Sequence, residues 1–322
     1  MTTALDEATF MALRIAAADD VADGIRRFEL VHPEGHDLPP FTPGSHISLL
    51  APNSAKRKYS LCNDAAERHR YVISVKREVG GRGGSISLID GARVGDTVRV
   101  SPPDNAFPLV DKAPRYVFIA GGIGITPILS MIRSFGPDCP TPWKLYYLSR
   151  APEFAAYLDE LTGPEYRGKV VVHHDHGDPN RAFDLWPVLE KPSNAHIYCC
   201  GPRPLMESVR DMTGHWSPAN IHFESFNEGG EVRPDDRPFT VRLAHSGKTV
   251  EVPVGQSILA TLRGVGCVIA SSCESGTCGT CKTRLLEGVA DHRDMVLLPE
   301  ETATHIMVCV SRAQSDELTL DV

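Results

Sequence analysis

The chain lacks an excess of basic residues, and it lacks any long apolar run. It carries 33 Lys and Arg against 41 Asp and Glu, a formal net charge of −8. Nucleic-acid-binding surfaces are basic, so this balance argues against a nucleic-acid partner. No apolar stretch approaches the roughly 20 residues of a membrane span, and residues 1–15 have no basic start followed by a long apolar core. We expect a cytoplasmic protein without a membrane or nucleic-acid partner.

The chain also does not have the even number of cysteines that a set of disulfides would use. The chain has nine, and four of them fall between Cys267 and Cys281. In a reducing compartment, clustered cysteines hold metal more often than they form disulfides. The total length of 322 residues allows two or three domains of about 100–200 residues each.

The chain changes character along its length, which predicts a multidomain fold. Short strand-like segments fill residues 1–110 and predict an antiparallel β-barrel. Strand and helix alternate through residues 111–226, which indicates a parallel α/β sheet. Residues 227–238 have no apolar residue except Val232 and suggest an exposed linker. Residues 239–322 combine a hairpin, a short helix, a cysteine loop and a closing strand.

The cysteine loop follows the spacing C-x4-C-x2-C, with a further cysteine after 27 intervening residues. This is the pattern of plant-type [2Fe–2S] proteins. Gly276 and Gly279 allow the tight turns that aim backbone N–H groups at sulfur. Zinc ribbons usually have two C-x2-C pairs and only one is present here; zinc, a disulfide and a thiol switch remain alternatives. The expected cluster ligands are Cys273, Cys278, Cys281 and Cys309.

Two segments of the first domain have the residue types that a flavin requires. The sequence RKYSLCN offers Arg57 for a phosphate, Tyr59 for the ring and Ser60 as a hydroxyl near N5. The glycine-rich stretch 80–84 leads into a predicted helix at Ser85, whose N-terminus can bind phosphate. Alone, the first segment is usually just a strand and the second a hairpin loop. Together they are a stronger signal.

Two loops of the second domain suggest a dinucleotide. AGGIGITPILS, residues 120–130, follows a β run and opens a helix, where a pyrophosphate sits in open α/β sheets. YCCGPRPLM, residues 198–206, repeats this arrangement, and the small Cys200 could flank a nicotinamide ring. We expect Cys199 to be core packing. VHHDHGD, residues 172–178, has three histidines but no partner with ligand spacing, so a polar loop is preferred over a metal site.

These motifs, in this order, resemble the ferredoxin-reductase-like flavoproteins that supply electrons to Rieske oxygenases. The likeness covers nearly the whole chain. It implies an FMN-binding barrel, an NADH-binding α/β domain and a C-terminal β-grasp ferredoxin domain. It also implies that electrons pass from NADH through FMN to the [2Fe–2S] cluster and then to an oxygenase.

The resemblance also implies site residues. For FMN these are Arg57, Lys58, Tyr59, Ser60, Val75, Lys76, Gly83, Gly84, Ser85, Thr126 and Phe226. For NAD they are Gly121, Gly122, Gly124, Thr126, Ser149, Arg150, Cys200, Gly201 and Pro202. No acid–base pair is expected, because the cofactors carry the chemistry. Flavin N5 accepts the hydride, with Ser60, Thr126 and Cys200 nearby.

The expected activity is that of an NADH-dependent reductase, with a Rieske-type oxygenase as its protein partner. Phthalate is the oxygenase substrate that the likeness suggests. A vanillate-type O-demethylase, a general NADH-dependent acceptor reductase and a non-enzymatic redox sensor are the alternatives. Ser149 and Arg150 could meet a 2′-phosphate, but the resemblance favours NADH and a monomer. From Asp235 onward the chain has 12 acidic and 8 basic residues, a balance that suits docking on a basic partner or simply aids solubility.

Overall fold

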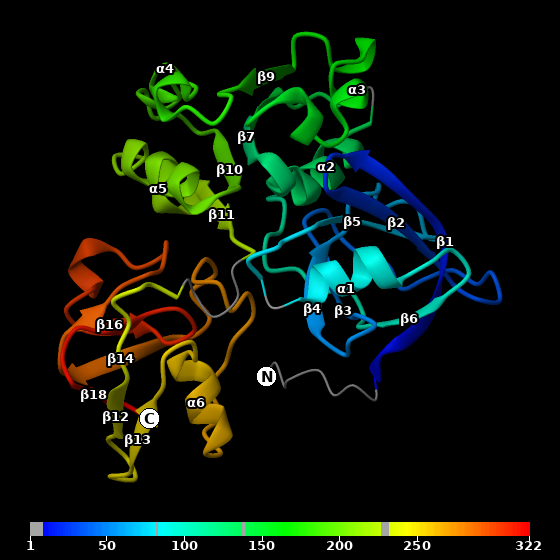
Figure 1. Cartoon of the computed structure of the whole chain (residues 1–322). Helices are drawn as coiled ribbons and strands as arrows, with labels where there is room; N and C mark the ends of the chain where they lie inside the picture. Colours follow the sequence, from blue (N-terminus) through cyan, green and yellow to red (C-terminus); the bar gives the residue numbers. More distant parts are fainter. Residues whose placement is uncertain (1–8, 82, 137–138, 227–231) are drawn as a thin grey trace. The chain divides into compact units, whose positions relative to one another are not determined.

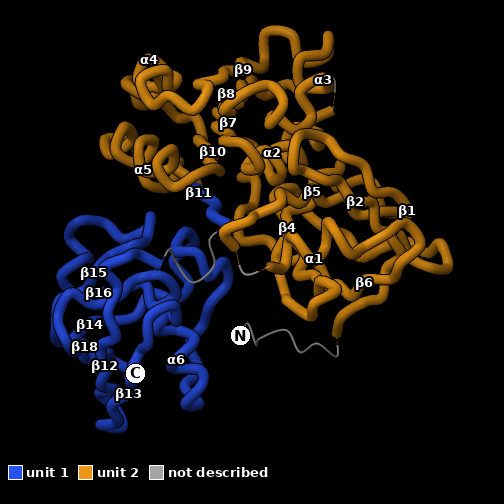
Figure 2. Tube along the Cα trace, in the orientation of Figure 1, with its two compact units in different colours: residues 1–4, 223–322 blue, residues 5–222 orange. Residues whose placement is uncertain are grey.

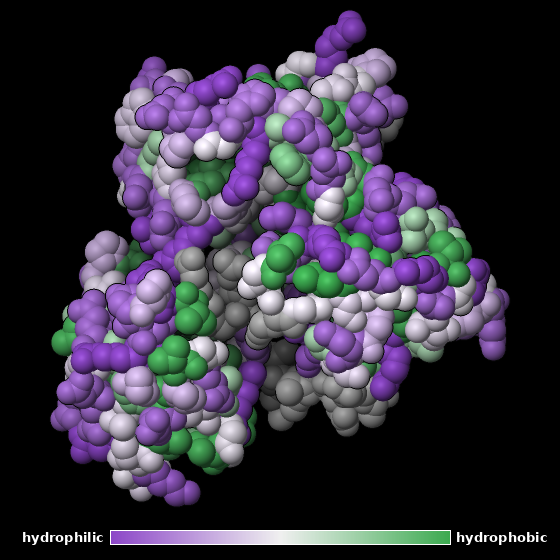
Figure 3. All heavy atoms as spheres, viewed as in Figure 1, coloured by the Kyte–Doolittle hydropathy of each residue, from purple (hydrophilic) through white to green (hydrophobic). Residues whose placement is uncertain are grey.

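The computed structural model describes residues 9–81, 83–136, 139–226 and 232–322. They form two compact units, one ending at His222 and the other running from Phe223 to Val322 (Figure 2). Each unit is described separately below. No helix among the described residues is long and apolar enough to cross a membrane. Polar residues cover most of the face seen in Figure 3, and apolar residues form small separate patches.

The first unit begins with a six-stranded antiparallel sheet of order β4-β3-β6-β1-β2-β5 (Figure 1). A bridge between Leu61 and Ile73 joins the two outer strands, which closes the sheet into a barrel. Alternation along β1 places Leu13 and Ile15 inside and Arg14 outside. The strands are β1 (Met11–Ala22), β2 (Ile25–Val31), β3 (His46–Leu50), β4 (Lys56–Ser60), β5 (Tyr71–Lys76) and β6 (Thr97–Val100).

One helix, α1 (Gly84–Gly91), interrupts the barrel strands and packs against β4 and β5. It starts one residue before the predicted position. Gly83 precedes it with φ of 78°, a left-handed conformation that favours glycine. The glycine-rich stretch therefore serves as the turn that starts this helix.

A five-stranded sheet of order β11-β10-β7-β8-β9 follows, and the unit boundary after His222 falls within its edge strand β11. Neighbours from β10 to β9 pair in parallel, and every residue of the central β7 is buried, as expected for a covered parallel strand. Helix α2 packs on β7 and β10, and α5 packs on β10. The strands are β7 (Tyr116–Gly121), β8 (Trp143–Ser149), β9 (Val170–His174), β10 (His196–Cys200) and β11 (Ile221–Glu224). The helices are α2 (Ile125–Ser134), α3 (Leu158–Leu161), α4 (Trp186–Leu189) and α5 (Arg203–Met212).

EFAAYLDEL, residues 153–161, is one of the stretches expected to be helical in the alternating α/β region, and it is broken in the structure. A 3₁₀ turn covers Pro152–Phe154, and α3 has only four residues. Between them Tyr157 takes a left-handed conformation with φ of 61°. Its buried hydroxyl lies 2.6 Å from Ser74 Oγ on the barrel. This tertiary hydrogen bond overrides the local helical pattern.

The second unit has a mixed sheet of order β13-β12-β18-β14-β16 and a two-stranded ribbon, β15 with β17. Helix α6 (Ile258–Gly264) contributes Ile258, Leu259 and Leu262 to the core, which also includes Cys281 and Cys309. The strands are β12 (Phe239–Leu243), β13 (Thr249–Val252), β14 (Lys282–Glu287), β15 (Ala290–Asp291), β16 (His305–Met307), β17 (Arg312–Ala313) and β18 (Glu317–Leu320).

Part of the predicted linker is packed against the second unit. Residues 227–231 of the prediction lie outside the described residues. Within the rest, Asp235 is exposed but the Asp236 side chain is only 3% exposed and bound to Arg293. A polar composition cannot reveal this, because the contact is ionic rather than apolar.

Candidate cofactor sites

The cysteine loop lies between α6 and β14, and its four predicted ligands form two pairs of thiols. Cys273 interacts electrostatically with Cys278, and Cys281 with Cys309. Cys273, Cys281 and Cys309 are buried, whereas Cys278 is partly exposed. All nine cysteines of the chain are free thiols. The structure therefore brings all four predicted ligands together and offers no support for a disulfide.

Backbone groups in the loop point at sulfur. The N–H groups of Ser275 and Thr277 donate to Cys273 Sγ at 3.4 and 3.5 Å. Gly276, between them, has φ of 77°, and a Cβ there would lie 2.7 Å from Val310 Cγ2. Only glycine fits this position without displacing its neighbours. The small residues of the motif thus allow a closely wrapped loop.

The arrangement of the thiols fits a two-iron cluster better than one zinc ion. A zinc ion with Zn–S distances of about 2.3 Å would draw all its sulfurs to one centre. Among the described residues, three or more possible metal ligands lie within 4.8 Å of one another only at His32, Glu34 and His36. This group has no cysteine, and its second and third members are exposed. Two separate thiol pairs instead suit two irons, each taking two thiolates. The interaction with Cys278 lowers the pKa of Cys273 and raises that of Cys278, so a thiolate, the form that binds metal, forms first at Cys273.

An ion pair that sequence reasoning missed supports the loop. Arg263, in the last turn of α6, donates to Glu274 Oε1 at 2.7 Å and also contacts Ser271 Oγ. Ser271 Oγ donates to the same carboxylate oxygen at 2.7 Å. Glu274 has φ of 56°, an uncommon value for a non-glycine residue, and these bonds hold it there. The sequence signal was a basic residue in the last helical turn before the motif.

The candidate flavin site lies where β4 faces the start of α1. A Cβ at Gly84 would lie 2.8 Å from Arg57 Nε, so the guanidinium lies directly against the first helical turn. An arginine beside a helix N-terminus attracts a phosphate through both its charge and the free N–H groups. The structure therefore brings the two predicted flavin segments together.

Tyr59 adds a polar group without a protein partner. Its hydroxyl is buried and has no hydrogen-bond partner among the described residues. Burial raises the pKa of Tyr59 to about 12, so the phenol stays neutral and can donate. Buried hydroxyl groups in proteins are nearly always hydrogen-bonded. The orphaned hydroxyl therefore fits a site completed by a bound ligand.

The other predicted flavin residues are not all on the same face. Alternation along β4 places Arg57 and Tyr59 together, and Lys58 and Ser60 on the opposite face. The Val75 side chain is fully buried in the barrel core, so only its backbone could meet a ligand. Lys76 is exposed and lies 3.4 Å from Glu78. These differences could not be seen from residue types alone.

The two candidate nucleotide loops meet at the carboxyl edge of the parallel sheet. Cys200, which ends β10, pairs with Ala120 of β7. A Cβ at Gly121 would lie 2.5 Å from Pro202 Cδ, and one at Gly124 would lie 2.1 Å from Cys200 O. The glycines therefore let the loops approach each other, at the edge where open α/β sheets bind ligands.

Three residues in or next to these loops are buried. Thr126 is buried, and its hydroxyl donates to Ile123 O at 3.0 Å. Cys199 is fully buried as expected, and Cys200 is nearly so.

The histidine-rich segment is only partly the predicted polar loop, because Val172, His173 and His174 belong to β9 and the loop begins after His174. Ser149 Oγ lies 2.8 Å from His174 Nδ1 across the β8–β9 pair, and Arg150 is exposed. His173 Nε2 donates to Arg181 O at 2.7 Å. These contacts engage one ring nitrogen of each of these two histidines. Phe226, predicted to pack on the flavin, belongs to the second unit and is 44% exposed.

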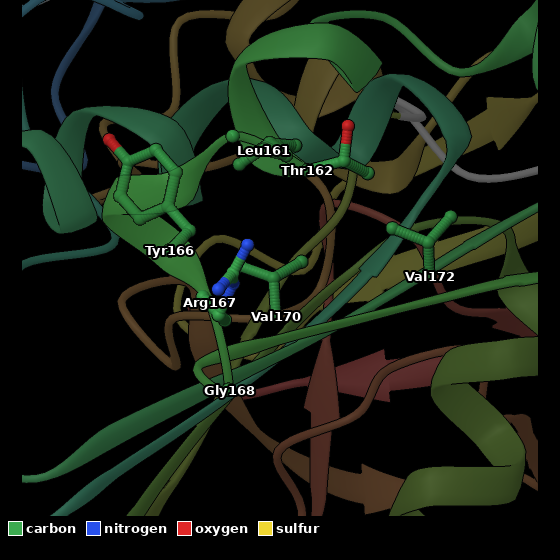
Figure 4. Close-up of a pocket in the computed structure, with 8 residues that line it drawn as sticks. Leu161, Thr162, Tyr166, Arg167, Gly168, Val170 and Val172 are labelled. Carbon is green, nitrogen blue, oxygen red and sulfur yellow. The ribbon is translucent and has the colours of Figure 1, made fainter.

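A separate hollow of about 230 Å³ lies beside the amino end of β9 (Figure 4). Tyr166, Arg167 and Val170 are among its lining residues. Val170 begins β9, whereas the nucleotide loops follow the carboxyl ends of β7 and β10. Because the strands are parallel, this hollow is at the opposite edge of the sheet and is not part of the nucleotide site.

Comparison with known proteins agrees with this architecture. Residues 118–211 match the oxidoreductase NAD-binding domain family, and residues 241–314 match the 2Fe-2S iron-sulfur cluster binding domain family. Fold and sites together define an NAD-dependent iron–sulfur oxidoreductase with a multidomain, ferredoxin-reductase-like fold. The predicted fold class and oxidoreductase class are confirmed.

The full-length relatives identify the family. The chain is 53% identical to phthalate dioxygenase reductase of Burkholderia cepacia, over 100% of both chains. It is 53% identical to the phthalate 4,5-dioxygenase oxygenase reductase subunit of Pseudomonas putida, over 97% of both. A solved phthalate dioxygenase reductase, described as a modular structure for electron transfer from pyridine nucleotides to [2Fe-2S], superposes with a TM-score of 0.76 over 98% of this chain and 99% of that one. The chain belongs to the phthalate dioxygenase reductase family, and the predicted FMN, NADH and [2Fe–2S] cofactors are those of this family.

Proposed function

We propose that the chain is the reductase component of a Rieske-type aromatic-ring oxygenase system, most directly a phthalate dioxygenase. It takes electrons from NADH and delivers them, through FMN and the [2Fe–2S] cluster, to the oxygenase. One observation supports this proposal most directly. A single chain has the two cysteine pairs of the C-terminal loop, the two glycine-rich loops that meet at the carboxyl edge of the parallel sheet, and Arg57 beside the start of α1, where a phosphate can bind. The oxygenase-reductase relatives support the choice of partner.

The flavin site is assigned from Arg57, Tyr59 and the first turn of α1. Arg57 and the helix N–H groups hold the phosphate, and the Tyr59 hydroxyl donates to the bound cofactor. Gly83 and Ser85 flank this turn. Lys58, Ser60, Val75 and Lys76 line the site through backbone or outer contacts, and Thr126 covers the ring.

The nucleotide site is assigned to the joined loops after β7 and β10. Gly121, Gly122 and Gly124 let the pyrophosphate approach the backbone, and Cys200, Gly201 and Pro202 flank the nicotinamide. Ser149 and Arg150 meet the adenosine end. The Ser149 hydroxyl is already engaged by His174, which supports NADH rather than NADPH as the donor.

When bound, the cofactors convert a two-electron hydride donor into single electrons for the oxygenase. The chain contributes positioning and electrostatics. The N–H groups of Ser275 and Thr277 stabilise negative charge on Cys273 sulfur, which raises the potential at which a cluster accepts an electron. Cys278, the partly exposed ligand, marks the side on which an acceptor can approach.

Spectroscopy and coupled turnover test the proposal. The purified protein should show flavin and iron–sulfur absorption, and anaerobic NADH should bleach both while NADPH bleaches neither at equal concentration. Turnover should then require an oxygenase, with phthalate dioxygenase and vanillate-type O-demethylase components compared side by side. A colourless preparation, or one that NADH does not reduce, would contradict the proposal. Light scattering checks the proposed monomer, and cell fractionation checks the proposed cytoplasmic location.

A further inference from the structure

Three side chains that can bind a metal ion lie together in the turn that follows β2. His32, Glu34 and His36 each offer one ligand atom, and these atoms lie within 4.8 Å of one another. His36 Nε2 lies 3.0 Å from Glu34 Oε2, and the ring centroids of the two histidines are 4.8 Å apart. Ligand atoms bound to one tetrahedral zinc ion are roughly 3.3 Å apart, and the centroids of two bound imidazoles are roughly 5 Å apart. The side chains are therefore already close to the spacing that a shared ion requires.

The backbone of the turn fixes this arrangement. Gly35 N–H donates to His32 O at 3.0 Å and closes a β-turn with Pro33 and Glu34 at its centre. Gly35 has φ of 76°, a left-handed value that favours glycine. Glu34 N–H donates to His32 Nδ1 at 3.2 Å, so this nitrogen has a free lone pair that is directed at the turn. A metal ligand needs a lone pair with this direction.

Both ends of the turn are fastened to the barrel. On one side Val31 ends β2, which pairs with β1. On the other side Leu38 is buried, and its N–H donates to Arg68 O at 2.7 Å. The Tyr71 hydroxyl donates to Pro39 O at 2.5 Å. The chain between these anchors is short, so little conformational freedom remains to be lost when an ion binds.

The set of donors selects a transition-metal ion. Two imidazoles and one carboxylate suit borderline divalent cations, whereas Ca²⁺ and Mg²⁺ require mostly oxygen ligands. Zn²⁺ accepts two histidines and one glutamate, has no geometric preference from its d electrons, and binds such ligands more tightly than Fe²⁺ or Mn²⁺. In the part of the chain that the structure describes, the Glu34 carboxylate pairs with His36 and with no Lys or Arg. No basic side chain therefore competes with the ion for this carboxylate.

We propose that His32, Glu34 and His36 bind one Zn²⁺ ion, with solvent in the remaining coordination position. The ion links the two sides of the turn, and its binding free energy adds to the stability of the barrel, because the unfolded chain does not hold the three ligands together.

This zinc site is separate from the cofactor sites. Leu30 of β2 pairs with Tyr71, the first residue of β5, so the turn lies at that end of the strand. Lys76, a predicted flavin residue, is at the other end of β5. The four cluster cysteines belong to the other unit. The zinc site therefore goes beyond the proposed function and does not depend on it.

Calorimetric titration of the full-length holoprotein with ZnCl₂ tests the site. The parent protein should bind one Zn²⁺ ion, and His36→Gln and Glu34→Gln should each weaken this binding by at least about tenfold, since even outer partners of metal ligands contribute that much. His245→Gln is the matched control. His245 is also an exposed histidine that lies 3.0 Å from a carboxylate, that of Asp321, but it belongs to no group of three ligands among the described residues. This control should bind Zn²⁺ as the parent does.

Thermal melts of the same four proteins give a second measurement. Saturating Zn²⁺ should raise the melting temperature of the parent and of His245→Gln, and leave those of His36→Gln and Glu34→Gln unchanged. Flavin reduction by NADH should be equal in all four proteins and shows that each is folded. A parent that binds no Zn²⁺ overturns the inference. Weakening by less than about tenfold in His36→Gln and Glu34→Gln, or an equal loss in His245→Gln, also overturns it, because the ion is then bound elsewhere.

Discussion

Gly124→Ala should separate the two nucleotide loops and weaken NADH binding. A methyl group at this position would lie 2.1 Å from Cys200 O and 2.5 Å from Cys200 C. Both atoms are backbone atoms at the end of β10, so no side-chain rotation can relieve the contact. The loops after β7 and β10 must instead move apart by about 1 Å to reach a tolerable separation of 3 Å or more.

The size of the effect follows from the cost of overpacking. Extra methyl groups in a well-packed region cost about 1–3 kcal/mol. If that strain must be relieved in the bound state, it weakens NADH binding by roughly 5- to 150-fold, since about 1.4 kcal/mol is a factor of ten. The cluster lies in the other unit, so its absorption should be unaffected.

Anaerobic flavin reduction at varied NADH concentration measures this effect directly. Gly214→Ala is the matched control, because a Cβ there meets nothing closer than Asp211 O at 3.8 Å in the same unit. Gly214→Ala should show the same NADH affinity and the same rate of flavin reduction as the unmodified protein. If Gly124→Ala also keeps NADH affinity within two-fold and the same melting temperature, the two loops do not meet as described, and the assigned nucleotide edge is refuted.

Three further changes test the other groups. Cys278→Ser should abolish reduction of a one-electron protein acceptor while flavin reduction by NADH continues, as followed by cytochrome c reduction and flavin bleaching. Tyr59→Phe should weaken FMN binding by roughly 3- to 10-fold, the value of one hydrogen bond, in a flavin fluorescence titration. Burial, together with His196 2.9 Å away, lowers the pKa of His222 to about 4. Because the unfolded chain then binds the extra proton below about pH 6.5, stability should fall as pH drops from 6.5 towards 4, and His222→Gln should flatten that slope in thermal melts.

Each of these three predictions would be contradicted by a specific result. Loss of flavin reduction in a folded Cys278→Ser protein would mean that the units do not work as separate modules. Unchanged FMN affinity in Tyr59→Phe would mean that the buried hydroxyl does not face the flavin. For the histidine pair, equal pH slopes in parent and variant would place the acid sensitivity elsewhere. Stability in all three cases is checked by circular dichroism.

The sequence was sufficient where chemistry depends on neighbours in the chain. Cysteine spacing predicted the ligand set, because a loop of nine residues must present three thiols over a short distance. Glycines at 80–84 and 121–124 predicted turns that lead into helices, and α1 and α2 begin there. Short strand-like segments in residues 1–110 predicted the barrel, and β1 to β6 all lie within that range.

The sequence was insufficient where a contact joins distant residues. Asp236 stands in a stretch with the composition of a linker, and only Arg293, 57 residues later, explains its burial. Tyr157 breaks a helical pattern because Ser74, 83 residues earlier, holds its hydroxyl. Arg263 and Glu274 show the same limit on a smaller scale. In each case the sequence shows a residue that can form a hydrogen bond or an ion pair, but the local pattern does not show which residue is its partner.

The two nucleotide motifs are physically one feature. Gly121 and Gly124 of the first motif are forced to be glycine by Pro202 and Cys200 of the second, and Gly201 of the second by Gly121 of the first. Taken separately, each motif is an ordinary strand–turn–helix junction. Because β7 and β10 are adjacent parallel strands, their turns occupy the same edge and can approach only without side chains. A requirement for glycine that arises between loops about 80 residues apart therefore identifies a shared ligand edge more specifically than either motif does alone.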